Sequence, residues 1–149
     1  MTAPKMACAC PPAVLPPPAG RRALWIVSAL VALLWSLPGF ALPLGDSGRG
    51  QGLYERCLAC HALRYNRTGP KHCGLLGRRA GSLPGFDFTR ALRDSGIVWT
   101  AETLDRFLAA PLEMVPGTAM TYDGLKDARE RADLIAFLAE ARPGSALCE

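Results

Sequence analysis

Apolar positions recur at helical spacing in three separate stretches of the chain. In the first, over 47–60, apolar side chains follow one another at intervals of four and three residues and end with Cys57 and Cys60, while charged residues occupy other positions. This spacing places the apolar side chains on one face of a helix. Asp46 or Ser47 can cap its first turn, because a short polar side chain accepts hydrogen bonds from the free amides there. We therefore predict a helix over 47–60.

A second helix is predicted over 101–110. Thr100 stands directly before it and can cap it. Pro111 ends it, because the residue before a proline is disfavoured in the helical conformation. One face of this helix is apolar and carries Leu104, Phe107 and Leu108.

The last helix is predicted to start at Asp127, whose carboxylate can cap it. Glu130, three positions further on, gives a start that resembles a capping box. Pro143 and Gly144 end the helix. Its apolar positions are Ala128, Leu134, Ile135, Leu138 and Ala139.

Two segments between the helices, 62–90 and 111–124, are predicted to be loops, because glycine and proline interrupt any regular period. The fold class is thus all-α, with three main helices and long connections. Loops of this length are unusual in a small domain unless a large group fills the space between them. A bound cofactor with an apolar surface would fill that space.

The first 41 residues differ from the rest and are predicted to form a Pro-rich leader and an export signal. A Pro-rich stretch and an arginine pair precede a 15-residue apolar run over 23–37. That run is short for a membrane helix, which needs about 20 apolar residues, and it suits the core of a signal peptide. Small residues precede a cleavage position after Ala41, and an uncleaved membrane anchor is the alternative. The predicted organisation is a signal over 1–41 and one domain over 42–149.

Composition and charge narrow the class of protein. The chain has 149 residues and a formal net charge of +4, of which residues 1–41 contribute +3. The remainder holds 14 basic and 13 acidic residues, so no basic block indicates nucleic acid as a partner. The length excludes a large multidomain enzyme. Six cysteines are too few for a disulfide-built scaffold, so each is considered by its position.

Residues 57–61 read C-L-A-C-H, which is the attachment signature of c-type haem. Two thiols at this spacing can form thioethers with the two vinyl groups on one edge of the macrocycle, and the adjacent histidine can reach the iron. A thioredoxin-type redox pair would need a βαβ context, which the helical pattern lacks. A zinc site would need a second ligand pair, and the adjacent His72 and Cys73 do not complete one convincingly. The motif therefore predicts one haem c, bound covalently through Cys57 and Cys60.

The second axial ligand of the iron has three candidates after residue 61: Met114, Met120 and His72. Met120 follows a rigid Pro-Gly turn in a loop, which can bring a thioether over the second face of the haem. Met114 lies close to Pro111 and can equally be a packing residue, and His72 is only eleven residues from His61. We favour Met120 and keep the other two as alternatives.

The motifs over 48–141 are collinear with those of class I cytochromes c, and this part of the chain resembles the cytochrome c2 and mitochondrial-like branch of that family. The matching runs include C-L-A-C-H at 57–61, T-G-P at 68–70, G-L-L-G-R at 74–78, G-I-V-W at 96–99, P-G-T-A-M at 116–120 and R-A-D-L-I-A-F-L at 131–138. The resemblance implies the small class I cytochrome c fold, in which the first and last helices cross and one haem lies in an apolar crevice. It also implies a close crossing of Gly50 against Phe137.

The resemblance implies roles for individual residues. His61 and Met120 match the axial ligands of the iron, and Cys57 and Cys60 match the thioether positions. Pro70 matches the residue whose carbonyl accepts the ring proton of the ligand histidine.

Three further matches border the haem in the family. Arg78 and Trp99 match partners of the haem propionates, and Thr118 matches a residue that anchors the ligand loop. The chain departs from the family at three positions where polar side chains are common: Phe88, Leu92 and Phe107. Because hydrogen bonds around the haem tune its reduction potential, these departures change the expected potential.

Cys73 and Cys148 stand where the family usually has no cysteine. In the family's fold, the segment after the first loop beside the haem lies near the end of the last helix, so the resemblance implies that these two residues can meet. We predict a disulfide between them. Two free thiols are the alternative, which an oxidising compartment disfavours.

The sequence and the resemblance together predict a periplasmic single-haem electron carrier and not an enzyme. Such a carrier shuttles one electron between a respiratory donor and an oxidase or dehydrogenase, so its partners are redox proteins rather than nucleic acid or a small-molecule substrate. Only two lysines, Lys71 and Lys126, follow residue 41, so strong electrostatic steering to an acidic partner is not implied. A dedicated cytochrome subunit of a periplasmic oxidoreductase is the alternative, and a small haem peroxidase or gas-binding protein is a further one.

Overall fold

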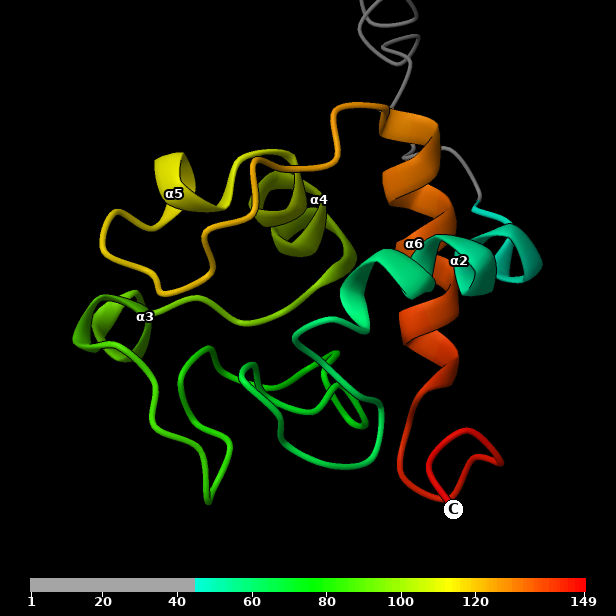
Figure 1. Ribbon diagram of the computed structural model, residues 1–149, viewed down its shortest axis with the longest axis horizontal. Helices are drawn as coiled ribbons and strands as arrows, with labels where there is room; N and C mark the ends of the chain where they lie inside the picture. The colour runs from blue at the N-terminus through cyan, green and yellow to red at the C-terminus, as the bar shows by residue number, and fades with distance from the viewer. Residues whose placement is uncertain (1–44) are drawn as a thin grey trace, which may run out of the picture. The chain divides into compact units, whose positions relative to one another are not determined.

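The computed structural model describes residues 45–149, which form helices joined by long loops (Figure 1). The elements of this range are α2 (Ser47–Tyr54), the 3-10 helix η1 (Glu55–Cys57), α3 (Arg90–Asp94), α4 (Ala101–Ala109), α5 (Pro111–Met114) and α6 (Ala128–Glu140). Within it, strand-like pairing is limited to an isolated bridge between Arg79 and Val98. The three longest helices, α2, α4 and α6, confirm the predicted all-α class with three main helices.

The leader and signal predicted over 1–41, and the alternative of an uncleaved anchor, lie outside the described residues. The domain boundary predicted at residue 42 also precedes the described range. None of the helices within that range has the length and apolar character that a membrane crossing requires.

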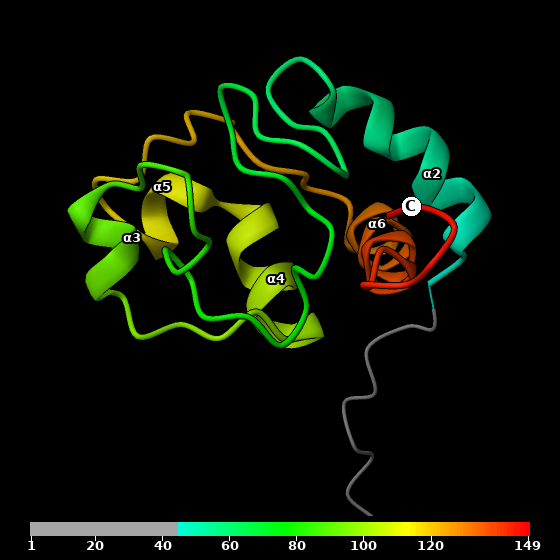
Figure 2. The same cartoon turned by 90° about the horizontal axis from the view of Figure 1, so that it is seen from below.

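α2 lies across α6, and this is the most extensive contact between the described helices (Figures 1 and 2). Gly50 allows the close approach, because a Cβ atom there would overlap the backbone carbonyl of Asp133 and lie 2.8 Å from the Cβ of Phe137. Tyr54, one turn further along α2, packs against the Phe137 ring with a centroid separation of 5.3 Å. The crossing of Gly50 against Phe137 that the family resemblance implies is therefore confirmed.

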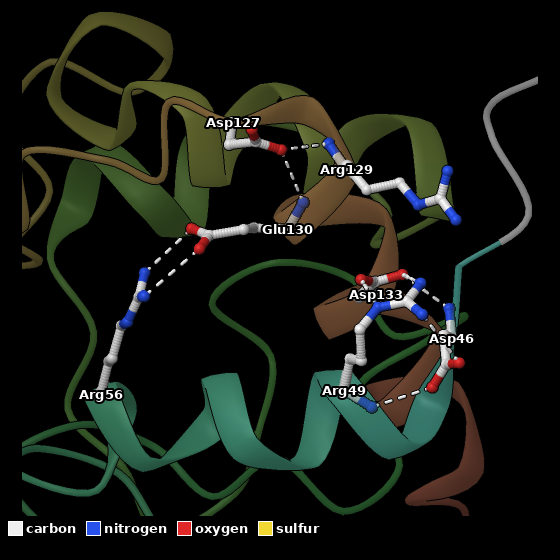
Figure 3. Close-up of polar contacts among 7 residues, drawn as sticks. All are labelled: Asp46, Arg49, Arg56, Asp127, Arg129, Glu130 and Asp133. Carbon is white, nitrogen blue, oxygen red and sulfur yellow. Dashed lines mark hydrogen bonds and ion pairs between the residues drawn. The ribbon is translucent and has the colours of Figure 1, made fainter.

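A buried carboxylate, Asp133, joins the two crossing helices (Figure 3). Its side chain is 4% exposed and accepts hydrogen bonds from Arg49 Nε at 2.7 Å and from Arg49 Nη2 at 3.0 Å. The amide of Asp46 donates a third bond at 2.7 Å. These contacts, the bond from Arg49 above all, lower the pKa of Asp133. Asp46 in turn caps α2 as predicted, by accepting from the Arg49 amide.

We expect Asp133→Asn to destabilise the protein at neutral pH and to flatten the dependence of its stability on acid. The folded-state pKa of Asp133 lies below its unfolded value, so its contribution to the unfolding free energy is present above the unfolded pKa of about 3.9. That contribution is lost as the pH falls through the folded pKa. Urea unfolding at neutral pH and at several values below about 4 measures both effects. Asp123→Asn, which removes an exposed carboxylate, is the control, and equal acid slopes in wild type and Asp133→Asn would contradict the prediction.

The other two long helices begin at their predicted caps. Thr100 Oγ1 accepts from the amide of Thr103 at 3.1 Å, and the Thr103 hydroxyl oxygen accepts from the amide of Thr100. These two bonds form a capping box at α4. Asp127 caps α6 by accepting from two amides, including that of Glu130 (Figure 3). The prediction of a capping-box-like start at α6 is wrong, because the Glu130 carboxylate does not return to the first turn but pairs with Arg56 of η1 at 2.9 Å.

The first helix is shorter than predicted. It ends at Tyr54, and η1 carries the chain to Cys57, so Cys60 lies in a turn and not in a helix. The reason is the tighter backbone that follows, in which the amides of Cys60 and His61 both donate to the carbonyl of Cys57, at 3.1 and 2.8 Å.

Two further predictions about the helices are wrong. The sequence predicts a loop over 111–124, whereas α5 begins at Pro111. Proline suits the first helical position, because its fixed φ is already helical and an amide there has no partner within the helix. The prediction also places Ala128 and Ala139 on the buried face of α6, but both are exposed. The buried apolar face of α6 is formed by Leu134, Ile135, Phe137 and Leu138.

Cys73 and Cys148 form the predicted disulfide, with Cα atoms 5.8 Å apart and a sequence separation of 75. The same region is held by backbone hydrogen bonds. The amide of Gly74 donates to Ala141 at 2.7 Å, and that of Cys73 donates to Leu63 at 2.8 Å. The segment that follows the C-L-A-C-H motif is therefore fixed to the C-terminal end of the chain.

Candidate haem crevice

A cavity of about 550 Å³ lies between the crossing helices, α4 and the long loops. Apolar side chains from α2, α4 and α6 contribute to its wall. The cavity brings together all eight predicted site residues, although they are spread over some sixty positions: Cys57, Cys60, His61, Pro70, Arg78, Trp99, Thr118 and Met120. A cavity of this volume accommodates an organic group rather than a single ion or water.

The two cysteines of the motif are unpaired thiols. Cys57 ends η1 and is partly buried, whereas Cys60 is exposed. Burial raises the pKa of the Cys57 thiol to about 11, so it remains protonated at neutral pH. Neither thiol is used in the disulfide, and both border the cavity, so both are available for thioether bonds.

His61 is buried and its imidazole is fixed in orientation. Its Nδ1 lies 2.7 Å from the carbonyl of Pro70, the contact that the resemblance implies. Gly69 lies against the ring so closely that a Cβ atom there would be 2.7 Å from both ring nitrogens. Burial lowers the pKa of His61, although the bond to Pro70 acts in the opposite direction. A neutral imidazole that donates through Nδ1 keeps a lone pair on Nε2, which is the form that binds a metal.

Met120 lines the cavity and is half-buried. The loop before it turns at Gly117, whose φ of +90° favours glycine. Thr118 is 8% exposed, and its Oγ1 accepts a hydrogen bond from the Met120 amide at 3.3 Å. The Thr118 amide donates to Val115 at 3.0 Å, so this hydroxyl connects Met120 to the end of α5.

The two alternative ligands are placed differently: His72 lines the cavity beside His61, and Met114 lies outside it. The His72 ring stacks on the ring of His61, with centroids 4.3 Å apart and an interplanar angle of 22°. Two ligands of one iron on opposite faces of a haem point at each other end to end, whereas these rings lie face to face. Met114 packs at the edge of the protein core and is not among the residues that line the cavity.

Arg78 and Trp99 both border the cavity. The guanidinium of Arg78 donates to the carbonyls of Cys73 and Lys71 at 3.2 and 3.3 Å. Burial lowers the pKa of Arg78, but the guanidinium stays cationic at neutral pH. Trp99 is 6% exposed and packs on Phe107, with a centroid separation of 4.9 Å. An acidic group at this wall would lie beside the guanidinium of Arg78 and the ring of Trp99.

Further residues of the cavity are absent from the predicted site. Leu104, Leu134 and Leu138 are predicted as core residues and also line the cavity. Helical periodicity identifies a buried face, but it does not distinguish packing against protein from packing against a cofactor. Tyr122, which is 39% exposed and lies two residues after Met120, has no periodic signal, and only its proximity to the ligand loop could have indicated it.

Crossing first and last helices, a C-L-A-C-H turn and an apolar crevice define a c-type cytochrome of class I. No model of a protein family matches the chain, but individual proteins do. The chain is 44% identical over 102 residues to cytochrome c type-1 of Ascaris suum, which corresponds to 66% of this chain and 91% of that protein. It is 39% identical over 121 residues to cytochrome c2 of Rhodomicrobium vannielii, or 79% of this chain and 95% of that one.

A solved structure agrees with these relatives. Cytochrome cH from Methylobacterium extorquens superposes with a TM-score of 0.63 at 38% identity, over 64% of this chain and 98% of that one. The chain belongs to the class I cytochrome c family.

Proteins of this family carry covalent haem c and transfer electrons without acting as enzymes. The residues present here fit that group. Two unpaired thiols and a neutral imidazole with a free ring nitrogen border one cavity, and that cavity is mostly apolar. The predicted cofactor, one haem c attached through Cys57 and Cys60, agrees with the family.

Proposed function

We propose that the protein is an exported, single-haem electron carrier of the periplasm. It passes one electron at a time between a respiratory donor and an oxidase or dehydrogenase partner. Three observations support this: the family is one of electron carriers, the sequence over 1–41 has the pattern of an export signal, and bacterial relatives include a cytochrome c2 and a cytochrome cH. We further propose that residues 1–41 are that signal and that 42–149 form the haem domain.

We propose His61 and Met120 as the axial ligands and Cys57 and Cys60 as the thioether positions. The haem, when bound, supplies a one-electron couple at its iron. The chain's own residues fix the histidine: Nδ1 of His61 donates its proton to the Pro70 carbonyl oxygen 2.7 Å away, which would leave Nε2 for the iron.

The crevice itself sets the conditions for electron transfer. Its apolar wall excludes water, so the surroundings reorganise little when the charge on the iron changes. We propose that Arg78 and Trp99 face the haem propionates and that Thr118 holds the Met120 loop through the bond to the Met120 amide. With His61 and Met120 as its two protein ligands, the iron would have no open position for a substrate.

The observation that carries the ligand assignment is that Met120 shares the cavity with His61, whereas His72 stacks on His61 and Met114 lies outside. We expect Met120→Ala to abolish the weak far-red absorption band of methionine–iron ligation in the ferric protein. The reduction potential should fall, because a thioether favours the ferrous state and axial ligands together span roughly 0.8 V. Optical spectra and potentiometry of protein produced with haem-maturation machinery measure both.

Met114→Leu is the matched control for this experiment, since it changes a methionine of the neighbouring helix α5. It should keep the band and the potential. Retention of the band in Met120→Ala, or its loss in Met114→Leu, would exclude Met120 as the ligand. A high-spin ferric spectrum of the wild type, or ready binding of carbon monoxide to its ferrous form, would favour a gas-binding or peroxidase role instead.

The near-neutral charge of the domain supports a second candidate function. With 14 basic and 13 acidic residues after position 41, the protein has little long-range electrostatic attraction for a partner. This suits a cytochrome subunit held permanently in a periplasmic oxidoreductase. Recovery of the native protein as a free monomer would support the free carrier, and recovery in a stable complex would support the subunit.

A further inference from the structure

A polar pair, the buried Tyr54 and the partly buried His72, lies behind the histidine that we propose as iron ligand. The His72 ring stacks on His61, and Nδ1 of His72 lies 3.0 Å from the hydroxyl of Tyr54. Tyr54 is 4% exposed and meets His72 edge-on, at a centroid separation of 5.6 Å and an interplanar angle of 66°. Its other side packs on Phe137 of α6. A continuous line of rings therefore runs from the helix crossing to His61.

Packing alone does not explain why polar side chains occupy these positions. A buried polar group without a hydrogen bond is destabilising, and an aliphatic residue would fill the same space at no such cost. Here the Tyr54 hydroxyl satisfies one nitrogen of His72. His72 also lines the cavity.

The backbone fixes the position of His72. Its amide donates to the carbonyl of Ala62 at 3.1 Å, and the next amide, of Cys73, donates to Leu63 at 2.8 Å. Cys73 is also anchored by the disulfide to Cys148. The segment that carries His72 is therefore tied directly to the residues that follow His61, and the two rings are held in register.

We propose that His72 is a positioning residue for the haem iron: its imidazole, held by Tyr54, fixes the ring plane of His61 and gives that ring a polar neighbour. This rests on the proposed function, in which His61 is an axial ligand. Groups that contact a metal-bound histidine set its orientation and its strength as a donor. Polar surroundings stabilise the ferric state, which carries one more positive charge, better than apolar surroundings do, so His72 lowers the reduction potential relative to an aliphatic residue.

The test compares His72→Leu, which removes the ring, with Tyr54→Phe, which removes one hydroxyl and keeps the packing. The control is Leu76→Ala, because Leu76 packs at the edge of the core and does not line the cavity. Each variant is studied as the full haem-loaded protein, by potentiometry and by electron paramagnetic resonance of the ferric form. We expect His72→Leu to raise the potential and to change the principal g values. Tyr54→Phe should shift the potential in the same direction by less, and Leu76→Ala should lower stability alone.

An unchanged or lower potential in His72→Leu, with wild-type g values, would overturn the proposal and leave His72 as a space-filling residue. If His72→Leu does not fold, the same criteria applied to Tyr54→Phe decide. Failure of the proposed function is seen separately in the wild type, as a high-spin ferric spectrum. A low-spin wild type with indifferent variants would contradict this inference alone.

Discussion

Gly50→Ala is expected to cost about 3 kcal/mol of unfolding free energy, because the new methyl group would overlap the backbone of α6. The atoms that it meets are the carbonyl carbon and oxygen of Asp133 and the Cβ of Phe137, none of which is the end of a flexible side chain. The crossing can admit the methyl group only if α2 moves away from α6. That movement would also disturb Tyr54, which packs on Phe137. Urea unfolding of the haem-loaded protein, followed by circular dichroism, measures the loss.

Gly52→Ala, two residues further along the same helix, is the matched control. Nothing lies within 4 Å of a Cβ at Gly52, so the substitution should stabilise the protein by about 0.5–1 kcal/mol through helix propensity alone. Opposite signs at the two glycines are the expected result. Equal small effects would show that the helices are not in close contact at Gly50.

The helix starts were predictable because their signals are local. Asp46, Thr100 and Asp127 each act on amides within three residues, so the sequence near the cap contains both partners. Pro111 shows the limit of a local signal. It is read as the end of α4, which is correct, but the same ring geometry also starts α5, and only the following residues decide whether a helix continues.

Small apolar residues indicated the buried face of a helix less reliably than large ones. Ala128 and Ala139 fit the apolar period of α6 but are exposed, whereas Leu134, Ile135 and Leu138 are buried as predicted. A methyl group gains little from burial, so its place in the period does not determine on which face it lies.

The part of the site that could be predicted from residue spacing is the haem-attachment motif. Two thiols and a histidine within five residues specify their cofactor directly. Arg78 and Trp99 lie far from that motif and were identified through family resemblance, since no local pattern connects them, whereas Met120 was favoured because it follows a Pro-Gly turn. The contact of His72 with Tyr54 follows from neither source, because it joins residues 18 apart through a loop whose path the sequence does not specify.

Removal of the disulfide, in the double variant Cys73→Ala with Cys148→Ala, is expected to cost roughly 4 kcal/mol in the chain-entropy model for a closed loop of this length. The loop spans 75 residues and contains most of the crevice. A cross-link across it limits the unfolded chain far more than the folded one, in which backbone bonds such as Gly74 to Ala141 already hold the two segments together. Chemical denaturation of the oxidised protein and of the double variant measures the difference.

Reduction of the wild type supplies the control, because thiol reductants cleave a disulfide but leave thioethers intact. Reduced wild type should therefore unfold at the denaturant concentration of the double variant with its haem still attached, and the double variant itself should not respond to reductant. Two reactive thiols in the denatured, unreduced wild type would contradict the bond itself. Equal stability before and after reduction would instead mean that the unfolded chain already keeps Cys73 near Cys148, in which case the cross-link stabilises nothing. Cys73 directly follows His72. If cleavage of the disulfide both lowers stability and shifts the reduction potential of the haem, the same bond also holds in place the ring that stacks on His61.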